Sequence, residues 1–134
     1  MRQLTGRRVL VVEDEAMIAL LMERVLLDAG ATVLGPAYSL AGALAMLAAN
    51  KPDAAVLDMN LNGASAAPVA DALAALGTPF VVVTGYDKSA VPLRHAGVPM
   101  LDKPYDPDEL VAVLVTLLSR HGRTAAAPSP DPSS

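Results

Sequence analysis

Three consecutive acidic residues, Glu13, Asp14 and Glu15, follow directly after a run of four aliphatic residues, 9–12. Two carboxylates about 4 Å apart repel each other by about 1 kcal/mol in water, and by several times more near a protein interior. Acids held together at the end of a buried segment therefore normally need a cation. The sequence raises the question of which cation this is and which chemistry it serves.

Three other residues with reactive or charged side chains occupy the same kind of position. Each follows a short apolar run: Asp58 follows residues 54–57, Thr84 follows 80–83, and Lys103 follows 98–101. If these runs are parallel strands, their carboxyl ends meet at one edge of a sheet, which is where open α/β folds bind ligands. Carboxylate and carbonyl oxygens with retained water suit Mg²⁺. We therefore expect Mg²⁺ among Asp14, Asp58 and neighbouring oxygens.

The elements that must position these residues follow from the apolar pattern. Short apolar runs alternate with segments of helical period, and four of the five runs are continuous, as is typical of parallel strands covered on both faces. The runs are residues 9–12, 31–34, 54–57, 80–83 and 98–101. This order predicts an α/β fold, a doubly wound (βα)5 flavodoxin-like parallel sheet with strand order 2-1-3-4-5.

Helix signals agree with this division. Three apolar faces of helical spacing are Ile18, Leu21, Met22 and Val25; Leu40, Leu44 and Leu47; and Leu110, Val113, Leu114 and Leu117. The segment from Asp106 to Glu109 supplies an N-cap, a first-turn proline and a capping-box acid for the last helix, whereas Pro92 makes any fourth helix brief or irregular. We expect one folded domain over residues 1–121 and a disordered tail rich in Pro, Ser and Ala over 122–134.

Composition narrows the function. A chain of 134 residues with 53% hydrophobic residues and a net charge of −4 predicts one domain without a basic surface for nucleic acid. It contains no cysteine, which excludes disulfides and thiolate chemistry. The N-terminus lacks the apolar segment of a signal peptide or a membrane span. We expect a cytoplasmic protein that contacts neither nucleic acid nor membrane.

Together these residues resemble a response regulator receiver domain over residues 7 to about 121. Receivers carry an acidic pair after the first strand, a phosphoacceptor Asp after the third, Thr or Ser after the fourth, and Lys-Pro after the fifth. The matching residues are Glu13-Asp14, Asp58, Thr84 and Lys103-Pro104. The resemblance implies transfer of a phosphoryl group from a histidine of a sensor kinase or phosphotransfer protein onto Asp58, and a cis Lys103–Pro104 bond.

The resemblance also implies a role for each site residue. Asp58 is the nucleophile, and Lys103 pairs first with Asp58 and then with the phosphoryl oxygens. Thr84 donates its hydroxyl to a phosphoryl oxygen. The implied Mg²⁺ ligands are Asp14 directly, Glu13 through water, Asp58, and the backbone carbonyl of Asn60.

One position departs from the common receiver pattern. Many receivers have an aromatic switch residue three places before the lysine, and this position is Met100. The segment PFVVVTGYD instead resembles a group of single-domain receivers nicknamed FAT GUY, in part because Thr84-Gly85 is followed by Tyr86. We predict that phosphorylation acts through Thr84, reorders the segment up to Gly97 and changes the environment of Tyr86.

Two other classes of protein are alternatives. A hydrolase of the haloacid dehalogenase type needs a second acid two residues after the nucleophile, where this chain has Asn60. A binding module without phosphotransfer is disfavoured by the presence of Asp58, Thr84 and Lys103. We therefore expect a single-domain response regulator rather than a turnover enzyme. Its output would be relay to another histidine or contact with a downstream protein, as a monomer or weak dimer.

Overall fold

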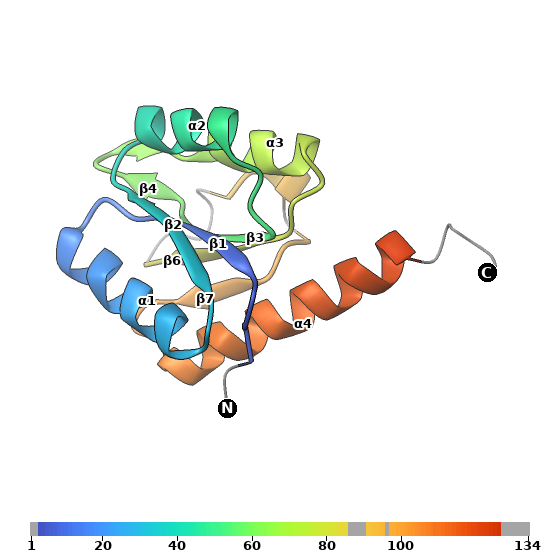
Figure 1. The fold of residues 1–134 in the computed structure, drawn as a ribbon. Helices are drawn as coiled ribbons and strands as arrows, with labels where there is room; N and C mark the ends of the chain where they lie inside the picture. The colour runs from blue at the N-terminus through green and yellow to red at the C-terminus, as the bar shows by residue number, and fades with distance from the viewer. Residues whose placement is uncertain (1–2, 86–90, 96, 127–134) are drawn as a thin grey trace.

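The main sheet contains five parallel strands in the order predicted from the sequence. The computed structural model describes residues 3–85, 91–95 and 97–126, and its strands lie in the order β2-β1-β3-β6-β7 (Figure 1). Their bounds are Arg8–Val12 (β1), Thr32–Ala37 (β2), Ala54–Asp58 (β3), Phe80–Thr84 (β6) and Met100–Asp102 (β7). The labels β4 and β5 belong to a separate antiparallel hairpin, formed by Asn60–Leu61 (β4) and Ala64–Ser65 (β5). The predicted order 2-1-3-4-5 is therefore confirmed.

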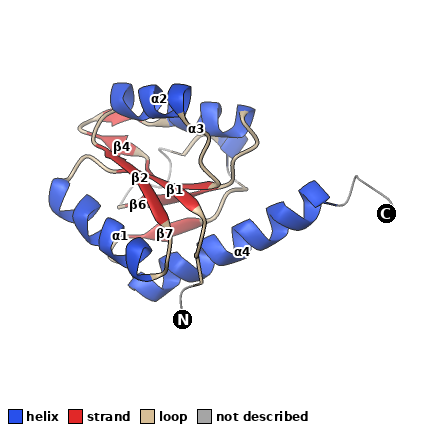
Figure 2. Cartoon of the chain, in the orientation of Figure 1, coloured by secondary structure: helices blue, strands red, loops and turns tan. Residues whose placement is uncertain are grey.

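Helices cover both faces of the sheet (Figure 2). Helices α1 (Ala16–Asp28) and α4 (Pro107–Ala126) pack on one face, and α2 (Leu40–Ala49) and α3 (Ala67–Ala75) pack on the other. Within the described ranges, none of these helices combines the length and the apolar character needed to cross a membrane.

Strand β1 shows why its apolar run is continuous. Val9 and Val11 belong to the core beneath α1 and α4, whereas Leu10 and Val12 belong to the core beneath α2 and α3. Successive side chains point to opposite faces of a strand, and helices cover both faces, so that every position is apolar. This double burial places the ends of the central strands, and the polar residues that follow them, at one defined edge.

The last helix begins as predicted but continues further. The carboxylate of Glu109 accepts a hydrogen bond from the N–H of Asp106 at 3.0 Å, and the carboxylate of Asp106 accepts one from the N–H of Asp108 at 2.9 Å. These bonds satisfy N–H groups at the start of α4. The helix runs to Ala126, beyond the domain boundary at residue 121 drawn from the sequence. Residues 127–134 lie outside the described residues, and their disorder stays a prediction.

The connection from β6 to β7 is short and irregular where the structure describes it. It includes a 3-10 turn, Leu93–His95, directly after Pro92, in agreement with the brief or irregular helix predicted there. Strand β7 starts at Met100, two residues later than predicted. Pro99 contributes to this late start because proline has no N–H to donate to the strand ladder.

Candidate functional site

Three carboxylates from two adjacent strands lie together at the carboxyl edge of the sheet. Glu13 and Asp14 directly follow β1, and Asp58 is the last residue of β3. The parallel register pairs Val12 with Leu57, which brings the two strand ends side by side. One carboxylate oxygen from each acid lies within 4.8 Å of the others. The predicted convergence of these acids is therefore present.

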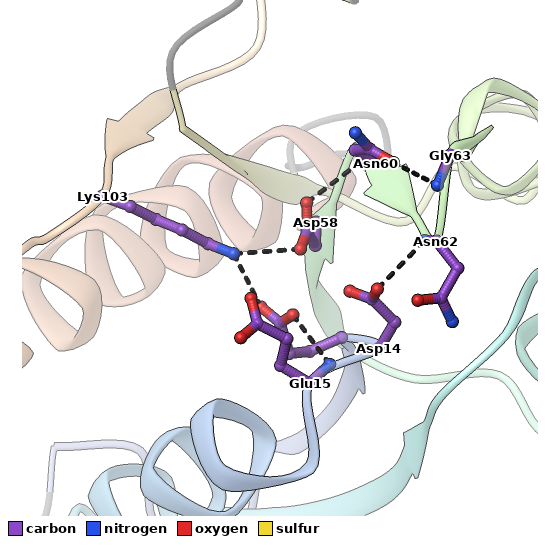
Figure 3. A network of polar contacts seen from close by, with 8 residues as sticks. Asp14, Glu15, Asp58, Asn60, Asn62, Gly63 and Lys103 are labelled. Carbon is purple, nitrogen blue, oxygen red and sulfur yellow. Dashed lines mark hydrogen bonds and ion pairs between the residues drawn. The ribbon is translucent and has the colours of Figure 1, made fainter.

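Lys103, which follows the end of β7, reaches two of these three acids (Figure 3). Its Nζ donates to Asp58 Oδ2 at 3.0 Å and to Glu13 Oε1 at 3.1 Å. Glu13 is fully buried and Asp58 is almost so, whereas the lysine side chain is partly exposed. The Lys103–Pro104 peptide bond is cis, as the resemblance implied.

Negative charge exceeds positive charge at this edge. Burial and the neighbouring Asp58 carboxylate raise the pKa of Glu13 from 4.5 to about 7, although the Glu15 N–H and Lys103 act in the opposite direction. Burial opposes the charge of Lys103, but its bonds to Asp58 and Glu13 outweigh this effect, and the pKa of Lys103 is raised. Among the described residues, one ammonium group is hydrogen-bonded to two of the three clustered acids, so an additional cation with a preference for oxygen ligands fits this site.

The third acid of the opening run has a different position. Glu15 is the N-cap residue of α1, its side chain is exposed, and its N–H donates to Glu13 Oε2 at 3.2 Å. An acid at this position interacts favourably with the helix dipole. The Glu15 side chain therefore stabilises the N-terminus of α1, and the Glu15 backbone N–H holds the Glu13 carboxylate.

Asn60 and Thr84 complete the residues predicted for the site. The N–H of Asn60 donates to Asp58 Oδ1 at 3.0 Å, so that both carboxylate oxygens of Asp58 are hydrogen-bonded. Thr84 is buried at the end of β6, and its carbonyl accepts the backbone N–H of Lys103 at 2.8 Å. Asn60, Thr84, Lys103 and Asp58 border one cavity.

This cavity has a volume of about 860 Å³ and a wall of mixed character. Its polar part contains Asp14, Asp58, Thr84 and Lys103. Its apolar part extends between α1 and the beginning of α4 and is formed by Ile18, Leu21, Met22, Val25, Tyr105 and Leu110. The Asp58 carboxylate is therefore next to an apolar surface.

The cavity wall on α1 coincides with the apolar face predicted there from Ile18, Leu21, Met22 and Val25, but its exposure was not predicted. The Leu21 side chain is 61% exposed. The inward stripe is instead formed by Ala19, Met22 and Leu26. Met17 and Leu20 are also exposed, so α1 is apolar over more than the one stripe that faces the core. This excess of apolar residues was a signal that could have identified the wall.

The predicted switch residues are placed only in part. Met100 is 38% exposed at the beginning of β7 and pairs with Val82, whereas Thr84 pairs with Asp102 at the other end of the same ladder. Tyr86 lies outside the described residues. Its proposed role therefore stays a prediction.

Fold and site together define an open α/β domain with an acidic cluster at the carboxyl edge of its sheet, and a comparison of the sequence with protein families identifies the class. The chain matches the response regulator receiver domain over residues 9–115. It belongs to this family, which confirms the resemblance seen in its motifs.

Individual relatives agree with this assignment. The chain is 37% identical over 130 residues to the transcriptional regulatory protein PrrA of Mycobacterium tuberculosis, covering 93% of this chain and 55% of that protein. It thus spans about half the length of the curated relatives it matches. Its fold is similar to the solution structure of SdrG from Sphingomonas melonis Fr1, with 41% identity, a TM-score of 0.74, and coverage of 88% of this chain and 99% of that one. A response regulator receiver protein from Sinorhizobium medicae WSM419 is 25% identical, with a TM-score of 0.75 and coverage of 86% and 96%.

Proposed function

We propose that this receiver domain accepts a phosphoryl group on Asp58 from a phosphohistidine of a sensor histidine kinase or a phosphotransfer protein, in a reaction that requires Mg²⁺. The environment of Asp58 carries the proposal. Lys103 Nζ and the Asn60 N–H each lie 3.0 Å from one of its oxygens, and the Asp14 carboxylate is adjacent. The nucleophile is held at the wall of a cavity that an incoming phosphoryl group can enter.

The transfer replaces one bond to phosphorus with another. An Asp58 oxygen attacks phosphorus in line, the P–N bond of the phosphohistidine breaks, and its electron pair returns to the imidazole nitrogen. Lys103 moves its hydrogen bond to a phosphoryl oxygen, and the Thr84 hydroxyl donates to another. Asp14, Asp58 and the Asn60 carbonyl would hold Mg²⁺, with Glu13 bound through water. When bound, the metal supplies positive charge against the phosphoryl oxygens.

The apolar wall supports a protein as the phosphodonor. Leu20 and Leu21 are exposed on α1, and Leu21 is part of the cavity next to the reactive carboxylate. Exposed apolar surface of this kind is suited to a protein contact rather than to a small charged ester. A helix that carries the donor histidine would cover this wall while its imidazole reaches Asp58.

The alternative of a phosphatase has less support. Asn60 stands where such an enzyme needs a second acid, and its amide oxygen accepts a hydrogen bond from the N–H of Gly63 at 2.7 Å. A neutral amide cannot relay a proton. We propose that the domain is not a turnover enzyme. It works in the cytoplasm, as a monomer or weak dimer, and signals through phosphorylation-dependent protein contacts or passes the phosphoryl group to another histidine.

Labelling with a small phosphodonor such as phosphoramidate tests the proposal. The wild-type chain should bind about one phosphoryl group in the presence of Mg²⁺, and both Asp58→Asn and excess chelator should abolish labelling. Asp53→Asn is the matched control, because Asp53 lies just before β3 at the opposite edge of the sheet, where it accepts the N–H of Arg8. It should be labelled like the wild type.

Three outcomes would contradict the proposal. Labelling of Asp58→Asn would show that the acceptor is another residue. Continuous release of phosphate by the wild type would indicate a hydrolase. A wild-type chain that is neither labelled by the small donor nor phosphorylated by any kinase of its own genome would indicate a binding module.

A further inference from the structure

A hairpin follows Asp58, and the proposed reaction assigns no role to its two-residue turn. Strands β4 and β5 are joined by Asn62 and Gly63, whose φ angles are 54° and 85°. Positive φ at both positions is the property of a type I′ turn, for which Asn-Gly is the preferred sequence. The side chain of Asn60 accepts the N–H of Gly63 and ties the turn to the first strand of the hairpin.

The hairpin contacts a carboxylate from each of the two strands that form the site (Figure 3). The N–H of Asn62 donates to Asp14 Oδ2 at 3.0 Å, and the N–H of Asn60 donates to Asp58 Oδ1 at 3.0 Å. Asp14 is only partly buried, so packing alone does not fix its carboxylate. The bond from Asn62 does so, because it links the loop after β1 to the loop after β3.

We infer that this hairpin is a positioning element for the metal site, with the Asn62 N–H holding the Asp14 carboxylate toward Asp58 and thereby setting the affinity for Mg²⁺. The inference rests on the proposed function, since it assumes that Asp14 binds the metal. A donor behind a ligating carboxylate limits its rotation and leaves its other lone pairs free for the ion. Loss of such outer partners typically weakens metal binding by about 10- to 100-fold.

The chain offers a matched pair of glycines for the test. A Cβ added at Gly63 would meet no atom within 4 Å, so that Gly63→Ala acts only through the positive φ. Gly77 has φ of 71° and equally open space, but it follows α3, at the end of the sheet opposite to the acids. The two substitutions should impose similar backbone strain at different distances from the metal site.

The experiment is a Mg²⁺ titration of the full chain followed by calorimetry and by amide NMR signals. Gly63→Ala and Asn60→Ala should weaken Mg²⁺ binding about tenfold, whereas Gly77→Ala should bind like the wild type while losing a similar amount of thermal stability. Asn60→Ala keeps the backbone carbonyl that is proposed to bind the metal.

The outcomes separate this inference from the proposed function. If the wild type binds Mg²⁺ and Asn60→Ala binds it equally well, the hairpin does not position Asp14 and the inference is wrong. Equal weakening by Gly63→Ala and Gly77→Ala would also overturn it, because the effect would then be general destabilisation. A wild-type chain that binds no Mg²⁺ would overturn both this inference and the metal requirement of the proposed reaction.

Discussion

Two clusters of acidic and basic side chains in this domain have opposite charge balance. At the carboxyl edge, the buried Glu13 and Asp58 share the single ammonium group of Lys103. The second cluster, which we call the Asp71 cluster, joins α3 to the 3-10 turn Leu93–His95. There the half-exposed Asp71 carboxylate contacts Arg94 through Nε and Nη2, both at 2.8 Å, and His95 Nε2 at 2.7 Å.

The acids respond in opposite directions. Burial and the neighbouring carboxylate raise the pKa of Glu13 to about 7. The hydrogen bonds from Arg94 and His95 hold the pKa of Asp71 well below its ordinary range. The carboxyl edge thus keeps negative charge that its own residues do not neutralise, whereas the Asp71 cluster is neutralised within the chain. This difference supports our proposal that an external cation and a phosphoryl group bind at the carboxyl edge and not at the Asp71 cluster.

The largest effect is expected when the carboxyl edge loses the ammonium group of Lys103, the one side-chain cation that contacts its acids among the described residues. Lys103→Met should reduce the rate of Asp58 labelling by about 100-fold or more, because the described part of the site would then hold no side-chain cation to meet the phosphoryl oxygens. It should also destabilise the unliganded domain, since Glu13 and Asp58 would then face each other without compensation. Labelling rates with a small phosphodonor and urea unfolding measure the two effects.

Lys51→Met is the control for this change. Lys51 is exposed at the opposite edge of the sheet, just before β3, where its carbonyl accepts a hydrogen bond from Arg8. Its loss should leave labelling unchanged. Similar labelling of Lys103→Met and the wild type would show that the lysine neutralises the resting acids but does not assist transfer.

The second prediction concerns the pH dependence of stability. The folded state binds the Glu13 proton more tightly than the unfolded state does, since its pKa is raised from 4.5 to about 7. The associated stability is fully present below the unfolded pKa and is lost as the pH rises through the folded value. Between about pH 5 and pH 8, the free energy of unfolding without metal should fall by about 1–3 kcal/mol.

Glu13→Gln tests this assignment by urea unfolding over the same pH range. The variant should lose most of the pH dependence, because the glutamine does not titrate. Saturating Mg²⁺ should also reduce the dependence in the wild type, since the metal favours the ionised acids. The lowered pKa of Asp71 predicts a pH dependence of the opposite sign: stability should fall as the pH decreases, but only in strongly acidic solution. An unchanged slope in Glu13→Gln would assign the titration to another group.

The carboxyl edge was predictable from sequence because parallel topology determines it. A residue directly after a central strand lies at that edge whatever the details of packing, which is why Asp58, Thr84 and Lys103 were found. The order of the strands followed from the same regularity. The continuous apolar runs predicted strands that are covered on both faces, and β1 and β3 are buried on both faces of the sheet.

The Asp71 cluster could not be predicted in this way. Asp71 and Arg94 are 23 residues apart, belong to different elements and share no periodic pattern. Their contact depends on how an irregular crossover packs against α3, which no local signal encodes. The same limit explains Leu21, whose exposure depends on the exact position of α1 against α4 rather than on helical spacing. Topology was readable from the sequence, and packing between irregular segments was not.

The smallest effect is expected at the Asp71 cluster. Asp71→Asn removes the charge but keeps an acceptor, so thermal stability should fall by no more than a few degrees and Asp58 labelling should be unchanged. Amide exchange at the turn Leu93–His95 should nevertheless become faster, because Arg94 loses its bidentate partner while α3 itself stays folded. Asp28→Asn is the matched control, because Asp28 pairs with Arg24 within α1 at 3.5 Å and this ion pair joins no second element.

The same variant bears on the proposed switch. The Asp71 cluster fastens one end of the segment from Thr84 to Gly97, which phosphorylation is predicted to reorder, and Thr84 lies at the other end beside the acids. The phosphoryl mimic beryllofluoride should therefore change amide exchange at Val91 and the turn more in Asp71→Asn than in the wild type. If exchange at the turn is the same in the variant and the wild type, with and without beryllofluoride, the cluster does not restrain the crossover. The carboxyl edge and the Asp71 cluster would then differ in their charge balance, but the Asp71 cluster would not limit the motion of the crossover.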